Sequence, residues 1–436
     1  MKPIVAIVGR PNVGKSVLFN KLIGRRKAIT KDEPGVTRDL NYADCEERGR
    51  LFTLVDTGGF EPEATEGIQR QVREQARLAV EEADAIVFVM DGRSGPMPGD
   101  REIVDMLRRS GKPVVYGVNK LDTAAAGDIV SDFYTLGMDE ALPLSAEHGL
   151  GISELLDEVL ARLPEAEPVE VGEEGIKVAI VGRPNAGKSS LLNRLIGRER
   201  SIVSDTPGTT RDSIDTVFEH GGRTHLFIDT AGIRKKNRIS RKLEAYCAME
   251  AIRSIDRCDV VLLVIDGREG VKSQDESIAG LIEKSGKACV IVINKWDVVE
   301  KDTGTTGKFI EEIRRTIPFL SFAPVLFVSA LSGQRTGKVF ETVERVNERG
   351  GREFPTSMVN KLLKEITARH SHPLHGNRSV KFYYTTQTGI RPQAFTVFAN
   401  HPRAVLESYR RYLVNSLRES LELGEVPLRV FFRKRH

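Results

Sequence analysis

The chain has 436 residues, of which 40% are hydrophobic and 29% are charged, a balance typical of ordinary globular proteins. At about 150 residues per domain, this length predicts about three domains. Apolar runs stay well short of the about 18 residues of a membrane span, and the first residues read directly into a strand-like segment, so we expect neither a membrane helix nor a signal peptide. The four cysteines form no CxxC pair. That spacing argues against a disulfide framework and a zinc site, and it favours a cytoplasmic protein.

The formal net charge of +4 is unevenly distributed along the chain. Residues 350–436 contain 15 Lys and Arg but only 6 Asp and Glu, a net charge of +9, which leaves −5 for residues 1–349. A short, strongly basic region favours a polyanionic partner such as RNA, and the alternative is a basic surface that is merely solvated.

Five short motifs of the first part of the chain return in the second. GRPNVGKS at 9–16 returns as GRPNAGKS at 182–189, PGVTRD at 34–39 as PGTTRD at 207–212, and DTGG at 56–59 as DTAG at 229–232, all with the same shift. NKLD at 119–122 returns as NKWD at 294–297 with a slightly larger shift, and SAE at 145–147 as SAL at 329–331 with the largest. A shift that grows only late predicts two domain-length copies with insertions near the end of the second.

The repeat and the composition together predict four segments. The joint between the copies holds five glutamates and no apolar period, which is typical of an exposed linker. We expect a first domain at 1–164, an acidic linker at 165–174, a second domain at 175–349 and a basic domain at 350–436.

Each copy alternates short apolar runs, rich in Val and Ile, with stretches of helical period. In the first copy the runs are 4–9, 51–56, 85–91, 113–119 and 141–146, and the helical stretches include 67–82 and 100–109. This alternation predicts an α/β fold with a doubly wound parallel sheet in each copy. Ligands bind such sheets at the carboxyl ends of the strands, where every repeated motif lies.

The GxxxxGKS motifs lie between a predicted strand and a predicted helix, as in the phosphate-binding loops of nucleotide-binding proteins. Their glycines allow close approach of backbone N–H groups to phosphates, while Lys15 and Lys188 are expected to reach the β- and γ-phosphates. The expected nucleotide-binding residues here are Gly9, Arg10, Pro11, Asn12, Val13, Gly14, Lys15 and Ser16, with Gly182, Arg183, Pro184, Asn185, Ala186, Gly187, Lys188 and Ser189.

The DTGG and DTAG motifs and the preceding threonines complete the phosphate side of each predicted site. Each aspartate is expected to close an apolar strand and hold Mg²⁺, and each threonine either completes the metal shell or is an ordinary turn residue. The expected Mg²⁺ ligands are Ser16, Thr37, Asp56, Ser189, Thr210 and Asp229. The nucleotide-binding residues of these motifs are Asp56, Thr57, Gly58, Gly59 and Phe60, with Asp229, Thr230, Ala231, Gly232 and Ile233. We expect the catalytic contributions from Lys15, Thr37 and Gly59, and from Lys188, Thr210 and Gly232.

The NKxD motifs indicate that the base is guanine. Guanine presents two adjacent donors that one carboxylate can accept in bidentate fashion, whereas adenine presents no such pair. Asp122 and Asp297 are the expected acceptors, and the weaker SA motifs supply backbone near the guanine oxygen. The full base-side set is Asn119, Lys120, Leu121, Asp122, Ser145 and Ala146, with Asn294, Lys295, Trp296, Asp297, Ser329 and Ala330.

This doubled motif set, over the full length of the chain, resembles the Der (EngA) family of bacterial GTPases. The resemblance implies two P-loop GTPase domains followed by a KH-like α+β domain. It also implies GTP and Mg²⁺ as ligands, hydrolysis of GTP to GDP, and a nucleotide-switched role in assembly of the large ribosomal subunit. We therefore expect a cytoplasmic monomer whose partners are that subunit and its rRNA.

The residues after the DTGG and DTAG motifs depart from Ras-like proteins. Phe60 and Ile233 stand where Ras-like GTPases keep a water-orienting glutamine, so hydrolysis needs another aid. In related GTPases an asparagine of the phosphate loop helps hold K⁺, a role that Asn12 and Asn185 match. The alternative is that these asparagines only brace the loop.

In the C-terminal region the pattern predicts a helix at 356–369, strands at 379–386 and 394–399, a helix at 401–423 and a strand at 428–433. This order agrees with a KH-like domain, but the GxxG loop that clamps nucleotides in RNA-binding KH domains is missing.

Other function classes fit the sequence less well. A tRNA-modifying enzyme with the same GTPase core would place a cysteine at its C-terminus, where this chain reads FFRKRH. A non-hydrolysing scaffold is opposed by the complete Lys, Ser and Asp sets, and a membrane-trafficking GTPase by the missing lipidation motifs.

Overall fold

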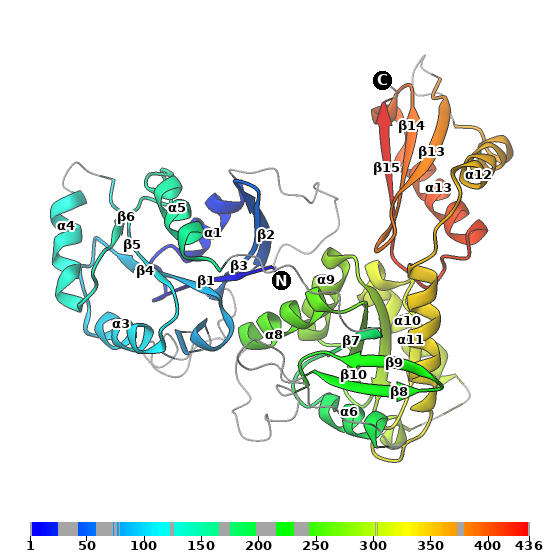
Figure 1. Ribbon diagram of the computed structural model, residues 1–436, viewed down its shortest axis with the longest axis horizontal. Helices are drawn as coiled ribbons and strands as arrows, with labels where there is room; N and C mark the ends of the chain where they lie inside the picture. Colours follow the sequence, from blue (N-terminus) through cyan, green and yellow to red (C-terminus); the bar gives the residue numbers. More distant parts are fainter. Residues whose placement is uncertain are drawn as a thin grey trace. The chain divides into compact units, whose positions relative to one another are not determined.

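We describe the fold from a computed structural model (Figure 1). The described residues are 2–24, 42–57, 73, 76–77, 79–122, 126–164, 175–197, 215–230, 244–300, 302, 304–372 and 379–434. They fall into two compact units, one within 1–171 and 242–250 and the other within 172–241 and 251–436.

The first unit is built on a six-stranded sheet of order β2-β3-β1-β4-β5-β6. Its strands are β1 (Ile4–Gly9), β2 (Tyr42–Glu47), β3 (Arg50–Asp56), β4 (Ala85–Asp91), β5 (Val114–Asn119) and β6 (Leu142–Pro143). All neighbours are parallel except β2, which pairs antiparallel with β3. The helices are α1 (Lys15–Gly24), α3 (Pro98–Ser110), α4 (Ala126–Phe133), the short η2 (Tyr134–Leu136) and α5 (Ile152–Arg162).

The second unit contains a matching sheet of order β12-β11-β10-β7-β9-β8. Its strands are β7 (Ile176–Val181), β8 (Thr216–His220), β9 (Arg223–Phe227), β10 (Val260–Asp266), β11 (Ala288–Asn294) and β12 (Val325–Phe327). Here β8 is the antiparallel edge strand. The accompanying helices are α6 (Lys188–Ile196), α9 (Ser273–Ser285), η4 (Trp296–Val298), α10 (Thr305–Thr316), η5 (Pro318–Leu320) and α11 (Gly337–Gly350). Helix α8 (Glu244–Arg257) is divided, since its residues 244–250 group with the first unit and 251–257 with the second.

The C-terminal region of the second unit forms a three-stranded sheet of order β13-β14-β15. Its elements are α12 (Thr356–Arg369), β13 (Phe382–Gly389), β14 (Gln393–Ala399), η6 (Pro402–Ala404), α13 (Glu407–Ser420) and β15 (Leu428–Lys434). β14 pairs antiparallel with β13 and parallel with β15. The fold class is therefore the predicted one: two α/β domains with mostly parallel sheets, followed by a small α+β domain.

Several element limits differ from the sequence prediction. The helix predicted at 401–423 is interrupted: Pro402 opens only a 3-10 turn, Val405 and Leu406 are extended, and α13 begins at Glu407. The strand predicted at 379–386 begins at Phe382 and runs to Gly389. The antiparallel edge strand β2 was not predicted, because its sequence YADCEE has no apolar run. Edge strands tolerate such polar sequences because one side faces water.

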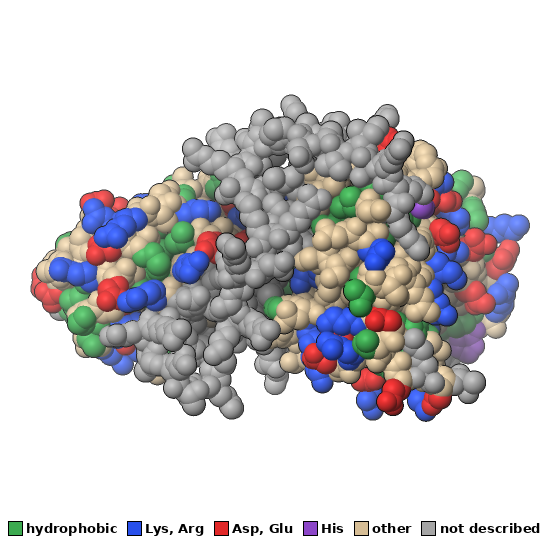
Figure 2. Space-filling model, turned by 90° about the horizontal axis from the view of Figure 1, so that it is seen from below, with side chains coloured by type: hydrophobic (Ala, Val, Ile, Leu, Met, Phe, Trp, Pro, Cys, Tyr) green, Lys and Arg blue, Asp and Glu red, His purple; other side chains and the backbone are tan. Residues whose placement is uncertain are grey.

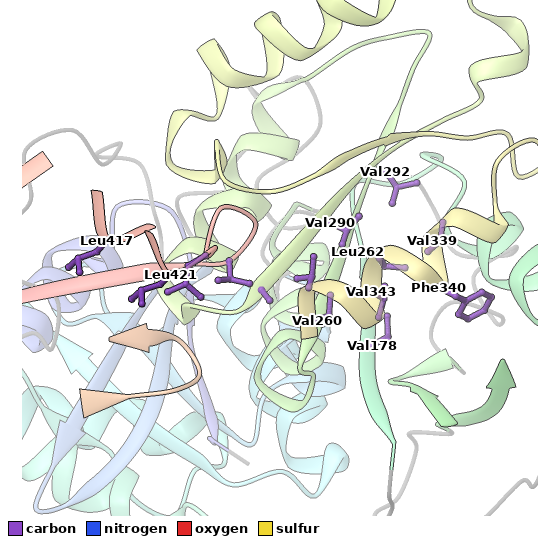
Figure 3. Packing of buried hydrophobic residues seen from close by; sticks show 14 of the residues in the cluster. Val178, Val260, Leu262, Val290, Val292, Val339, Phe340, Val343, Leu417 and Leu421 are labelled. Carbon is purple, nitrogen blue, oxygen red and sulfur yellow. The ribbon is translucent and has the colours of Figure 1, made fainter. Parts of the chain in front are cut away.

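Buried apolar residues of the central strands form the core of each unit. Every residue of β1 and of β10 is buried, as expected for strands covered by helices on both faces. In the second unit one continuous cluster joins the strands to α11 and then to α12 and α13 of the C-terminal region. Figure 3 shows 14 of its members and labels ten, among them Val178 of β7, Val343 of α11 and Leu417 of α13.

Ion pairs add to the contact between the C-terminal region and the rest of the second unit. Glu425 accepts hydrogen bonds from the guanidinium groups of Arg345 (Nε–Oε2, 2.8 Å) and Arg349 (Nη1–Oε2, 2.6 Å), both on α11. At the other side Arg391 lies 3.6 Å from the Asp259 carboxylate. Both contacts lie inside the second unit.

The described surface is mixed in charge. On the face shown in Figure 2, Lys and Arg side chains alternate with Asp and Glu side chains, and apolar side chains occur in small groups. Within the described ranges no helix is long and apolar enough to cross a membrane.

Candidate functional site

The two GxxxxGKS loops connect β1 to α1 and β7 to α6, as the motif predicts. In each loop the lysine side chain folds back onto the loop's own carbonyl oxygens. Lys15 Nζ lies 2.9 Å from both Gly9 O and Arg10 O. Lys188 Nζ lies 2.6 Å from Gly182 O and 3.0 Å from Arg183 O. These bonds fix the lysine at the N-terminus of the helix, where anions are favoured.

The second glycine of each loop makes room for the asparagine of the NKxD motif. Gly14 and Gly187 have φ of 95° and 93°, in the left-handed region that favours glycine. A Cβ at Gly14 would lie 2.4 Å from Asn119 Nδ2, and one at Gly187 would lie 2.2 Å from Asn294 Nδ2. Both the backbone conformation and the space therefore require glycine here.

The buried asparagines join the phosphate loop to the base-side motifs. Asn119 Nδ2 donates to Val13 O (2.8 Å), and Asn119 Oδ1 accepts from the N–H of Ala146 (2.9 Å). Asn294 repeats both bonds, to Ala186 O (3.0 Å) and from the N–H of Ala330 (3.0 Å). The structure thus brings the phosphate-loop, NKxD and SA motifs together in both domains.

The residues Asn12 and Asn185 have φ of 65° and 66°. Asparagine tolerates this left-handed conformation better than most residues, which accounts for its presence in both loops. The two loops therefore make the same turn.

The aspartates of the DT motifs are placed differently in the two domains. Asp56 is the last residue of β3, and its Oδ2 accepts from Ser16 Oγ at 2.7 Å. Asp229 lies two residues beyond the end of β9, so the prediction that it closes the strand is wrong. Its φ of 55° is incompatible with a strand, and its N–H donates to Asp215 Oδ1 (2.8 Å).

The residues after these aspartates are held by their hydroxyl groups. Thr57 Oγ1 donates to Ile7 O at 2.7 Å, and Thr230 Oγ1 lies 2.7 Å from Thr216 Oγ1. Eight predicted site residues lie outside the described ranges, namely Thr37, Gly58, Gly59, Phe60, Thr210, Ala231, Gly232 and Ile233.

Ser16 and Asp56 together fit Mg²⁺. Hydroxyl and carboxylate oxygens are the hard donors that this ion prefers, and the two side chains meet at the mouth of the phosphate loop. No group of three or more His, Cys, Asp or Glu side chains suited to a metal occurs within the described part of the chain. Mg²⁺ commonly takes only one or two carboxylates from a protein, and phosphates and water supply its other ligands.

Each NKxD lysine is held by an aspartate that the motif analysis missed. Lys120 Nζ lies 2.7 Å from Asp91 Oδ2, and Lys295 Nζ lies 2.6 Å from Asp266 Oδ2. Burial alone would raise the pKa of Asp266, but hydrogen bonds from Arg268 and Lys295 outweigh it and lower this pKa to about 2. The signal was available, since DGR at 91–93 returns as DGR at 266–268, with the same shift as the NKxD motifs.

The candidate guanine acceptors Asp122 and Asp297 are exposed, whereas their neighbours Leu121 and Trp296 are buried. The Asp122 carboxylate lies 3.3 Å from the Arg93 guanidinium and 3.9 Å from His148 Nε2. Both carboxylates are therefore accessible from solvent.

The arginine of each phosphate loop is anchored on a buried aspartate, which is a second missed pair. Arg10 Nε donates to Asp100 Oδ1 at 2.9 Å, and Arg183 Nε lies 3.2 Å from Asp275 Oδ2. Burial raises the pKa of both carboxyls, to about 6 for Asp275.

The same two carboxyls also cap a helix. Asp100 Oδ2 accepts from the N–H of Met97 (3.1 Å) before α3, and Asp275 Oδ2 from the N–H of Lys272 (3.0 Å) before α9. Asp100 thus connects the first phosphate loop to the start of α3, and Asp275 connects the second to the start of α9. The two positions are again related by the shift of the NKxD motifs, a spacing that could have identified them.

Comparison with known proteins gives matches along the whole chain. A model described as "50S ribosome-binding GTPase" matches residues 4–120 and 177–295, and a model of the C-terminal "KH-domain-like of EngA bacterial GTPase enzymes" matches residues 353–433. Proteins named GTPase Der from Geotalea uraniireducens and Geobacter metallireducens are 50% and 51% identical over 435 residues, covering 100% of this chain and 99% of each relative.

Solved structures resemble the chain only in part. A crystal structure of Era in complex with MgGDPNP and nucleotides 1506-1542 of 16S ribosomal RNA is 24% identical, covers 60% of this chain and 94% of that chain, and has a TM-score of 0.31. The family assignment rests on the sequence matches. The chain belongs to the Der (EngA) family of P-loop GTPases, with two G domains and a KH-like C-terminal domain.

Proposed function

We propose that both G domains bind and hydrolyse GTP, with domain limits of 1–164 and 175–349, separated by the linker 165–174 and followed by the KH-like domain 350–436. The observation that carries this proposal is the repeated hydrogen-bond network around Asn119 and Asn294. A network that joins three loops in the same way in both copies supports two working sites rather than one.

On the phosphate side, Lys15 and Lys188 neutralise the β- and γ-phosphates from the helix N-terminus. Bound Mg²⁺ would supply charge stabilisation for the phosphates that react. Ser16 and Asp56 would hold that ion in the first domain, and Ser189 and Asp229 in the second. Thr37, Gly59, Thr210 and Gly232 complete the proposed catalytic set, with Gly58, Phe60, Ala231 and Ile233 beside them.

On the base side, Asp122 and Asp297 accept the two adjacent donors of guanine. The asparagines accept hydrogen bonds from the N–H groups of Ala146 and Ala330 and so hold the SA motifs next to the NKxD motifs. The backbone of the SA motifs would lie near the guanine oxygen. The lysine stems, fixed by Asp91 and Asp266, would cover the base.

Base selection is tested by Asp122→Asn and Asp297→Asn in the full chain. Each change replaces an acceptor by an amide, so the altered domain should lose GTP affinity by more than about 100-fold, since two charge-assisted hydrogen bonds of roughly 1.5–3 kcal/mol each are lost. Xanthosine nucleotides should bind instead, which titration with fluorescent XDP measures. Unchanged GTP binding at two sites in both variants would contradict the assignment of the base pocket.

We further propose that K⁺ stimulates hydrolysis, with Asn12 and Asn185 helping to hold it. The equal left-handed φ of the two residues supports a common role. Replacing KCl by NaCl at equal ionic strength should slow GTP turnover by at least about tenfold, since one stabilising charge is lost at the transition state. Equal rates in both salts would refute the role of K⁺ and leave the GTPase assignment intact.

The cellular role that we propose is nucleotide-switched assembly of the large ribosomal subunit, by a cytoplasmic monomer that contacts rRNA. The support is the family membership, the family description of ribosome binding and the +9 charge of residues 350–436. Sedimentation of the purified chain with large-subunit particles in GTP, GDP or a non-hydrolysable GTP analogue tests it. We expect the protein to pellet with the particles in one nucleotide state, and equal absence from the pellet in all three would overturn the role.

A further inference from the structure

One face of the C-terminal sheet is open to solvent. The buried side chains of β14, such as Phe395 and Val397, belong to the same cluster as Leu363 of α12 and Leu413 of α13, so the helices cover that face. Because side chains alternate along a strand, residues 394, 396 and 398 lie on the opposite face. There Tyr384 of β13 is 38% exposed and Phe431 of β15 is 46% exposed, whereas Thr396 of the central strand between them is buried.

Strand pairing arranges this open face in rows. Across the sheet, Tyr384 lies opposite Phe398, which lies opposite Arg433. The neighbouring row is Thr386, Thr396 and Phe431. We call these six residues the open sheet face.

The aromatic rings of the first row already form a platform. The rings of Tyr384 and Phe398 stack with centroids 4.4 Å apart and an interplanar angle of 16°. Phe431 is on the adjacent strand in the neighbouring row and lacks a ring contact among the described residues. Two flat apolar surfaces therefore lie close together on one exposed face.

A β-bulge explains why the platform is exposed. Phe382 and Tyr384 are two residues apart and would normally share a face. The register shifts between them, so that Phe382 pairs with Ala399 and stacks on Tyr409 of α13 (centroids 5.6 Å apart), while Tyr384 pairs with Phe398. The extra residue of the bulge thus turns Tyr384 to the open side.

The open sheet face carries one charged side chain, the cationic Arg433, and no Asp or Glu. The basic residues of the helix side are differently engaged: Arg410 lies over the Phe432 ring at 4.9 Å and donates to Pro402 O at 3.1 Å, and Arg411 pairs with Glu407. Arg429, one row below Phe431, donates to Lys284 O of α9 (3.0 Å).

We propose that the open sheet face binds unpaired RNA, with bases stacked on Tyr384, Phe398 and Phe431 and a phosphate paired with Arg433. Aromatic platforms beside cationic side chains are a general means of binding single strands, because every base has a ring to stack. The face thereby supplies what the missing GxxG loop would otherwise provide. This inference rests on the proposed rRNA association and names its place in the fold.

The test uses the full chain and a fluorescein-labelled, single-stranded 12-nucleotide RNA, read by anisotropy over a KCl series. Tyr384→Ala and Phe431→Ala should each weaken binding by about tenfold or more, with an unchanged salt slope. Arg433→Ala should lower the slope of log K against log salt by about 0.7. Duplex RNA of the same sequence should bind the wild type and these variants with the same affinity.

Two matched controls separate this face from general effects. Tyr134→Ala removes a comparably exposed ring (44%) of the first G domain, and Arg411→Ala removes an exposed charge from α13. Both should bind the RNA as the wild type does. GTP turnover should be unchanged in all five variants, because the altered side chains lie outside the G sites. Melting temperature should be unchanged in four of them and slightly lower in Tyr384→Ala, which loses the stack on Phe398.

Three results would overturn the inference. The first is equal RNA affinity of wild type and sheet-face variants, and the second is no measurable RNA binding by the wild type. The third is loss of ribosomal particles from the variants with unchanged RNA affinity, which would assign the face to a protein partner. In the first and third cases the proposed function still holds if the wild type pellets with the particles. If the wild type fails to pellet in every nucleotide state, the proposed function is wrong, whatever the RNA measurement shows.

Discussion

The two G domains share the frame that holds the phosphate loop and differ where the metal and the base would bind. The lysine, asparagine and arginine contacts repeat in both domains. Asp56, by contrast, ends a strand and bonds to Ser16, whereas Asp229 lies beyond its strand in a left-handed conformation.

The base sides differ in their charge partners. Arg93 of the first DGR motif lies 3.3 Å from Asp122, the candidate guanine acceptor. The matching Arg268 lies 3.2 Å from Asp266 of its own motif. Identical motifs therefore place their arginines differently. The repeated sequence gives the same hydrogen bonds around the phosphate loop in both domains, but it does not give the exposed charged side chains the same partners.

The largest expected effect separates the two domains by their lysines. Lys15→Ala and Lys188→Ala together should abolish GTP turnover, and each alone should reduce turnover in its own domain by on the order of 100-fold or more, because a phosphate-stabilising charge is lost. Steady-state phosphate release measures both. Lys21→Ala, on the same helix as Lys15, is the control and should leave turnover unchanged. If neither single change has an effect, the two domains are not independent sites.

The shared frame is tested next by Gly14→Ala and Gly187→Ala. The added methyl would overlap the asparagine amide, so we expect the altered domain to lose nucleotide affinity by at least about tenfold and stability by roughly 1–3 kcal/mol. Gly49→Ala and Gly222→Ala are matched controls, since both positions have positive φ but no atom within 4 Å of a new Cβ. Isothermal titration with GDP gives the affinities. Equal losses in controls and test variants would mean that backbone strain alone is responsible.

A smaller effect should distinguish the two lysine-holding aspartates. The Asp266 carboxylate accepts hydrogen bonds from the side chains of both Lys295 and Arg268, whereas the Asp91 carboxylate accepts one from the side chain of Lys120. Asp266→Asn should therefore weaken GTP binding more than Asp91→Asn, by about five- to tenfold against a few-fold, because an ion pair with a partly exposed cation is worth about 1 kcal/mol or less. Nucleotide titration of both variants measures this. A larger loss in Asp91→Asn would show that Arg268 does not strengthen the second site.

The last expected effect concerns stability rather than nucleotide binding, and it is a pH dependence that comes from Asp275. Its folded pKa of about 6 is above the ordinary value of 3.8, so the folded chain binds a proton that the unfolded chain releases between these pH values. The contribution of Asp275 to the free energy of unfolding is therefore complete below about pH 4. It is lost as the pH rises to about 6, by roughly 3 kcal/mol in total. Asp275→Asn should gain melting temperature relative to wild type, by a few degrees, from pH 4 to pH 7. A constant difference across this range would contradict the raised pKa.

Sequence alone predicted the features that depend on strong local patterns. Buried strands such as β1 and β4 are continuous apolar runs, and the predicted limits, 4–9 and 85–91, are those of the structure. The phosphate loops and the NKxD motifs lie where strand–helix alternation places them. The α/β fold class followed from the same patterns.

The remaining features depend on tertiary contacts that leave weak local signals. The helix break before Glu407 coincides with a hydrogen bond from the N–H of Leu406 to His372 Nε2 (3.1 Å), 34 residues away. Asp100 and Asp275 look like ordinary polar residues of a first helical turn, and beyond their repeated spacing only their burial beside an arginine reveals their place. The conformation of Asp229 depends on Asp215, which no motif includes.

The continuous core of the second unit has a consequence for how the chain unfolds. Val346 of α11, Val359 of α12 and Val426 before β15 belong to one buried cluster with the strands of the second G domain. Removing either part would expose the other part's half of this cluster to water, at roughly 25 cal/mol for each Å² of apolar surface. The second G domain and the KH-like region should therefore melt together as one cooperative block, so that calorimetry of the intact chain resolves two transitions although the sequence holds three domain-like regions.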